Sequence, residues 1–171
     1  MMVTRCYVAG AIVALLASSS AAEAGDPVQG DRLFRITRNK NDNIVCYDVR
    51  NKDGKLDKET PVSVYWVIPS KKNNLENLNF LERTKAYGIS VVKEFGQDSV
   101  DIQLKAGKRP IRVTVRGGRW VALTILDSGE VALDSVYVMA EESGMNPKVQ
   151  WVEVMGRFPE TGVSVRKKIT K

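Results

Sequence analysis

The chain has 171 residues, a net charge of +6 and a hydrophobic content of 43%, which suits one globular domain with a sizeable core. It contains no histidine, which excludes the usual general base of hydrolase triads and the commonest zinc ligand. Its two cysteines, Cys6 and Cys46, cannot form a Cys/His zinc site or a Cys–His nucleophile pair. Enzymatic activity would therefore have to use carboxylate, lysine or tyrosine chemistry. The sequence predicts neither a metal site nor a cofactor.

Residues 1–24 have the three-part layout of a secretory signal peptide. Arg5 precedes an apolar run from Tyr7 to Ala17, and Ala22-Glu23-Ala24 has the small residues that a signal peptidase requires. The run is shorter than the roughly 20 apolar residues that span a bilayer as a helix, so we expect cleavage before Gly25 and no retained anchor. The expected product is an exported, soluble protein, periplasmic or secreted. Residues 25–171 would form a single β-rich domain with no transmembrane segment.

The positive charge survives this processing, because residues 1–24 carry one cation, Arg5, and one anion, Glu23. A basic protein attracts anionic partners, although positive charge is also an ordinary means of staying soluble. In an exported protein the expected partners are lipid head groups or envelope polymers, and nucleic acid is not expected. Cys46 would be the single remaining cysteine, and its apolar surroundings favour a small buried hydrophobe over an exposed thiol.

Alternation of apolar and polar residues predicts about ten β-strands along the chain. In chain order they are Leu33–Arg38, Asn43–Arg50, Val62–Trp66, Ile89–Phe95, Val100–Lys105, Ile111–Arg116, Trp120–Leu126, Val131–Glu141, Val149–Arg157 and Val163–Ile169. Short turns such as Gly117-Gly118 join many of them, so neighbouring strands should be antiparallel.

The segment from Asn74 to Tyr87 is the one stretch that we expect to be helical. Asn74 would cap its first turn, and Gly88 would end it. One side of this helix would pack on the sheet through its apolar residues, which are Leu75, Leu78, Leu81 and Ala86.

Many short antiparallel strands with one helix must hide the edges of their sheet. This favours a mainly β, antiparallel, barrel-like domain that is closed or nearly closed, with a two-sheet β-sandwich as the alternative.

The segment Asn51–Asp57 resembles the middle of a calcium-binding loop, with oxygen ligands at alternate positions and a glycine at the tight turn. The positions that would need acidic ligands are occupied by Val49 and Thr60. A hairpin turn at Asp53-Gly54 explains the same residues, and we expect that turn.

Two groups of residues are candidates for binding. Cations concentrate on one predicted hairpin, where they would form a continuous positive ribbon for an anionic surface: Lys108, Arg109, Arg112, Arg116 and Arg119. Such a ribbon also guards sheet edges against aggregation.

The second group combines aromatic and basic residues that could line a pocket for a small ligand: Tyr65, Trp66, Arg83, Lys85 and Tyr87. In many β domains aromatic residues of this kind belong to the core.

Four stretches of charged and aromatic residues carry a resemblance to a known family. They are Leu33–Lys40, Ile44–Arg50, Pro61–Pro69 and Phe80–Gly88. In this order they resemble a secreted bacterial family known as domain of unknown function 4833. The resemblance implies an exported single domain, and it implies no activity, cofactor or catalytic residue.

By exclusion of the other classes, we expect the protein to be an exported, non-enzymatic binding module. Its ligand would be a small molecule or an anionic component of the cell envelope. The alternative is a hydrolase or other enzyme that works without histidine or metal, for example through Glu82 beside the cations of the helix.

Overall fold

The structure, a computed structural model, describes residues 30–72, 74–127, 129–141 and 148–170. The predicted signal peptide lies outside the described residues. Within the described ranges, no helix has the length and apolar character needed to cross a membrane.

Every strand predicted from the alternation is present, with ends that differ by at most two residues from the prediction. These strands are β1 (Arg32–Arg38), β2 (Asn41–Val49), β5 (Val62–Val67), β7 (Ile89–Glu94), β8 (Ser99–Leu104), β9 (Pro110–Arg116), β10 (Arg119–Leu126), β11 (Gly129–Glu141), β12 (Lys148–Arg157) and β13 (Ser164–Thr170). Alternation found most of them because one face of the strand lies in the core and the other toward the surface, as in β1, β8 and β9, although β7 and β13 contain no buried residue.

Three further strands are short. β3 (Asn51–Lys52) and β4 (Lys55–Leu56) form a small hairpin across Asp53-Gly54, the turn that we predicted in place of a calcium loop. Both turn residues have positive φ, at 54° and 76°, which is the conformation of the tight turns that suit hairpins. β6 (Leu75–Asn77) pairs with the end of β5.

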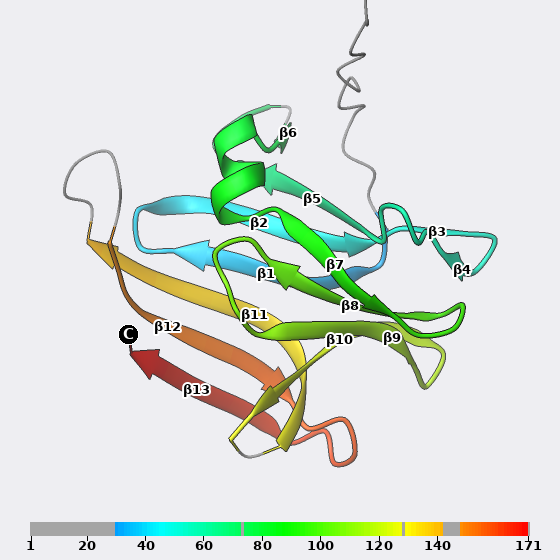
Figure 1. The fold of residues 1–171 in the computed structure, drawn as a ribbon. Helices are drawn as coiled ribbons and strands as arrows, with labels where there is room; N and C mark the ends of the chain where they lie inside the picture. Colours follow the sequence, from blue (N-terminus) through cyan, green and yellow to red (C-terminus); the bar gives the residue numbers. More distant parts are fainter. Residues whose placement is uncertain (1–29, 73, 128, 142–147, 171) are drawn as a thin grey trace, which may run out of the picture.

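The main sheet is a single surface that curls into a half-barrel (Figure 1). Its strand order is β6-β5-β2-β1-β11-β10-β9-β8-β7, and β12 and β13 extend it from the other edge of β11. This confirms the mainly β, barrel-like prediction, and the single sheet excludes the two-sheet sandwich. One pairing differs from the prediction: β1 and β11 are parallel, with Arg35 opposite Ser135.

The helix predicted over Asn74–Tyr87 is wrong in its first half. Leu75–Asn77 is strand β6, because these residues pair with Tyr65, Trp66 and Val67 of β5. Helical structure is limited to a short turn that begins at Phe80 and continues as the π-helix η1 (Glu82–Ala86). Asn79, and not Asn74, caps this turn: its Oδ1 accepts the Glu82 N–H at 2.9 Å, and a Glu82 carboxylate oxygen accepts the Asn79 N–H at 3.0 Å.

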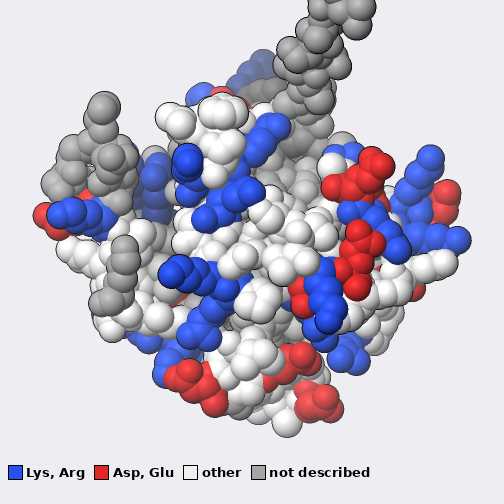
Figure 2. All heavy atoms as spheres, viewed as in Figure 1, with Lys and Arg blue, Asp and Glu red and all other residues white. Residues whose placement is uncertain are grey.

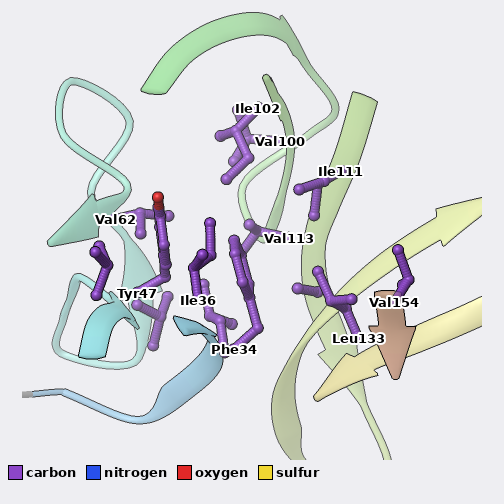
Figure 3. Packing of buried hydrophobic residues seen from close by; sticks show 14 of the residues in the cluster. Phe34, Ile36, Tyr47, Val62, Val100, Ile102, Ile111, Val113, Leu133 and Val154 are labelled. Carbon is purple, nitrogen blue, oxygen red and sulfur yellow. The ribbon is translucent and has the colours of Figure 1, made fainter. Parts of the chain in front are cut away.

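The core lies on the concave face of the half-barrel (Figure 3). Phe34 of β1 stacks on Tyr47 of β2 with ring centroids 4.3 Å apart, and both side chains are fully buried. They face Ile102 and Val113, which come from the opposite wall of the curl. The interior is thus filled by side chains, as in other small β-barrels.

Candidate anion-binding surface

The turn between β8 and β9 is joined to the end of the helical turn by backbone hydrogen bonds. The Lys105 N–H donates to the Gly88 carbonyl at 2.8 Å, and the Ala106 N–H donates to the Ala86 carbonyl at 3.1 Å. These bonds continue the antiparallel β7–β8 pairing past Ile89 and Leu104, and they hold two segments that are about twenty residues apart in sequence against each other.

This junction gathers basic residues from both segments. We call them the basic face, and they are Arg83 and Lys85 of η1 together with Lys105, Lys108 and Arg109 of the β8–β9 turn. All are exposed, and none forms an ion pair within the part of the chain that the structure describes. In Figure 2, Lys and Arg side chains lie over the helical turn and the segment beside it, while the acidic side chains in view lie mainly to the right of centre and near the bottom.

Three side chains of the basic face donate hydrogen bonds to neutral partners. Lys105 donates to the Ser90 hydroxyl at 2.5 Å, and Arg109 donates to the Ile125 carbonyl at 3.0 Å. Arg83 donates a longer hydrogen bond, at 3.4 Å, to the Leu78 carbonyl. These contacts orient the cations without an ion pair. Asp127 lies close enough to Arg109 to interact with it electrostatically, but it accepts its hydrogen bond from Lys167, at 2.7 Å. The face can therefore attract an external anion.

The predicted cationic ribbon on β9 and β10 is not continuous. Arg112, at its centre, donates to both carboxylate oxygens of Asp101, at 2.9 and 3.3 Å, and these hydrogen bonds raise the pKa of Arg112. Its guanidinium also lies 4.4 Å from the centre of the Phe95 ring. Asp101 therefore interrupts the positive charge at the middle of the ribbon and leaves two separate basic parts. Lys108 and Arg109 join the basic face, while Arg116 and Arg119 lie opposite each other at the far turn.

The predicted aromatic site is also divided. Trp66 and Tyr87 meet edge to face with ring centroids 5.1 Å apart, and the Trp66 indole N–H donates to Glu82 at 3.1 Å. This contact anchors the helical turn on the core. Arg83 and Lys85 lie on the exposed side of the same turn, and Tyr65 lies on the opposite face of β5, so these residues do not line one pocket.

Tyr65 belongs to a buried polar cluster on the outer face of the sheet. Its hydroxyl donates to Asp48 at 2.6 Å, and Arg32 forms an ion pair with the other carboxylate oxygen. Burial, and then the hydrogen bond to Asp48, raise the pKa of Tyr65 to about 12. A phenol with this pKa is neutral at physiological pH, and the carboxylate is fully occupied by its partners. The cluster therefore favours a structural role over acid–base catalysis.

The described residues contain little else that resembles an active site. No group of His, Cys, Asp and Glu among them is arranged to hold a metal ion. Cys46 is buried, as predicted, and burial raises the pKa of its thiol. One surface hollow of about 290 Å³ lies over β11, β12 and β13, and another of about 100 Å³ lies beside Arg112.

Comparison with protein families decides the affiliation of the chain. The family model described as domain of unknown function (DUF4833) matches residues 34–168. The chain belongs to this family. The match confirms the resemblance drawn from the sequence, and it attaches no activity to the fold. No curated protein and no solved structure matches the chain.

Sequence reasoning found four members of the basic face but assigned them to two separate sites. It missed Lys105, which it placed at the end of a strand. The signal that could have joined them is the pairing of the two predicted strands Ile89–Phe95 and Val100–Lys105, which places Gly88 opposite Lys105. Asp48 was also missed. It lies within an apolar strand, where a lone carboxylate requires a buried partner.

Proposed function

We propose that this protein is an exported, non-enzymatic binding module that attaches to an anionic component of the cell envelope through its basic face. The observation that carries the proposal is the junction between η1 and the β8–β9 turn, which brings cations from two segments together with no ion pair to a carboxylate among the described residues. The groups that such a face would recognise are phosphates or carboxylates.

The filled interior of the half-barrel argues against a small ligand held inside the sheet. The core residues are in contact across the curl. Of the two surface hollows described above, the larger lies over β11, β12 and β13, and the one of about 100 Å³ adjoins Arg109 through Pro110 and Ile125. A broad exposed face suits an extended anionic surface better than a small molecule, which is usually enclosed by a concave site.

Electrostatics set the expected strength of this attachment. Each cation near an anionic membrane surface contributes about 1 kcal/mol, so several acting together give useful affinity. The attraction should fade with salt, because the Debye length falls from roughly 10 Å at 0.1 M to 3 Å at 1 M ionic strength.

The test compares two charge-reversal variants that alter the same hairpin. Lys108→Glu with Arg109→Glu changes the basic face, and Arg116→Glu with Arg119→Glu makes an equal change of charge at the far turn. Binding to vesicles containing phosphatidylglycerol, and to an isolated envelope fraction, is measured by co-sedimentation at low and high salt.

We expect the first variant to bind at least roughly thirtyfold more weakly, because two favourable terms of about 1 kcal/mol become repulsive. The far-turn variant should lose much less. Equal loss in both variants would mean that net charge alone drives binding, and unchanged binding in both would contradict the proposal. All four side chains are exposed, so neither variant should unfold.

A further inference from the structure

Two large apolar side chains project from the molecule beside the basic face. Phe80 is 77% exposed and Leu81 is 67% exposed, at the start of the helical turn. Adjacent exposed side chains of this size are costly to leave in water, and large exposed apolar groups mark contact sites.

The turn that carries them is held firmly by its neighbours. Asn79 and Glu82 cap it reciprocally, and the same Glu82 carboxylate accepts the hydrogen bond from the buried Trp66. The Thr84 hydroxyl donates to the Phe80 carbonyl at 2.8 Å. Phe80 and Leu81 are therefore presented outward on an anchored segment, although the core lies directly beneath it.

These apolar residues are placed next to cations. Phe80 is three residues before Arg83, and Leu81 is four residues before Lys85, so both cations follow the apolar pair within the same short helical turn. Figure 2 shows uncharged atoms over this turn with Lys and Arg atoms around them. An apolar tip surrounded by cations has the chemistry of the interfacial region of a bilayer, where apolar side chains enter the acyl boundary and cations meet the head groups.

We propose that the occupant of the basic face is a bilayer of anionic lipid, and that Phe80 and Leu81 insert into its interface. This inference rests on the proposed function and specifies its partner. A hydrophilic anionic polymer would satisfy the cations equally well, but it offers no apolar phase to Phe80 and Leu81. Their exposure therefore favours the bilayer, and charge complementarity selects a negatively charged one.

The experiment compares a Phe80→Ser, Leu81→Ser variant with the unsubstituted protein. The probes are vesicles of phosphatidylcholine with phosphatidylglycerol, vesicles of phosphatidylcholine alone, and soluble polyphosphate as an anionic polymer without an apolar phase. The matched control is Val149→Ser with Val163→Ser, which removes exposed apolar side chains from the opposite end of the sheet.

We expect the serine variant to bind anionic vesicles roughly tenfold or more weakly than the unsubstituted protein, with its binding to polyphosphate unchanged. The Val149, Val163 control should bind both probes normally. In a second measurement, a Phe80→Trp variant should gain fluorescence that is quenched by brominated acyl chains in anionic vesicles.

Undiminished vesicle binding by the serine variant, or fluorescence at position 80 that brominated lipid does not quench, would overturn the inference. The proposed function would still stand if the Lys108, Arg109 charge reversal abolished binding in the same assay. Failure of that charge reversal would overturn both.

Discussion

At the scale of single residues, Asp48 and Tyr65 stabilise one another inside the sheet. Both side chains are buried, and their hydrogen bond of 2.6 Å joins β2 to β5 on the outer face. The Asp48 carboxylate also accepts a hydrogen bond from the Gly30 N–H and forms an ion pair with Arg32. A buried carboxylate is tolerated because each of its oxygens is paired, and removal of one partner leaves a buried polar atom unsatisfied.

Tyr65→Phe should therefore lower the free energy of unfolding by about 2 kcal/mol at pH 8, since it removes a hydrogen bond to a charged acceptor. The difference from the wild type should shrink at higher pH. The folded protein holds the phenol proton with a pKa of about 12 against an ordinary value of 10.0, so this stabilisation is complete below pH 10 and is lost as the pH rises toward 12. Urea unfolding at pH 8 and pH 11 measures both differences, and a difference that stays constant would contradict the raised pKa.

The sequence predicts which residues are candidates for a site more readily than it predicts which of them lie together in the fold. Trp66 and Tyr87 were named together and do meet, because both are large apolar residues that the core gathers. Tyr65 was placed with Trp66 because it is adjacent in sequence, yet adjacent residues of a strand point to opposite faces. The role of Tyr65 depends on its partner Asp48. The pairing of β2 with β5 brings these two residues near each other, and no pattern of neighbouring residues in the sequence predicts that contact.

At the scale of elements, the helical turn is fixed mainly by Glu82. This one carboxylate accepts the Trp66 indole N–H and the Asn79 backbone N–H. At the end of the same helical turn, the Tyr87 carbonyl accepts a hydrogen bond from the Tyr47 hydroxyl at 2.7 Å inside the barrel. Glu82 thus connects the core to the segment that carries the basic face.

Glu82→Ala should cost about 2 kcal/mol of stability, because the buried Trp66 N–H loses its acceptor and the turn loses its cap. Glu82→Gln keeps an acceptor oxygen and should recover most of that loss. Glu59→Ala, at an exposed position, serves as the control and should change stability by less than about 0.5 kcal/mol. Unfolding in urea gives the comparison; an Ala variant as stable as the wild type would show that the carboxylate does not hold the turn.

The error over Asn74–Tyr87 has a physical cause at the same scale. The leucines at positions 75, 78 and 81 repeat at helical spacing, but Leu78 alone of the three is buried. The end of β5 would otherwise remain an unpaired edge, and Leu75–Asn77 covers it as β6. Pairing with a neighbouring strand outweighed a weak helical pattern, as tertiary contacts commonly do.

At the scale of the whole molecule, alternation predicted the strands and the curled sheet because both depend on which faces are buried. The order of strands was less accessible. The parallel pairing of β1 with β11 joins residues about a hundred positions apart, and it allows β12 and β13 to continue the sheet beyond the half-barrel. No turn or short-range pattern encodes that contact, and it follows from the way in which the long strand β11 is shared between β10, β1 and β12.

The basic face depends on the pairing of β7 with β8, since that pairing brings the end of η1 against the β8–β9 turn. Lysine acetylation in the presence and absence of phosphatidylglycerol vesicles at low salt, read by mass spectrometry, tests the attachment without any substitution. Lys85, Lys105 and Lys108 should be protected when the protein is bound, while Lys52 and Lys55 of the β3–β4 hairpin should react as in the free protein. Protection of the β3–β4 lysines with continued modification of Lys85, Lys105 and Lys108 would contradict the basic face as the attachment surface.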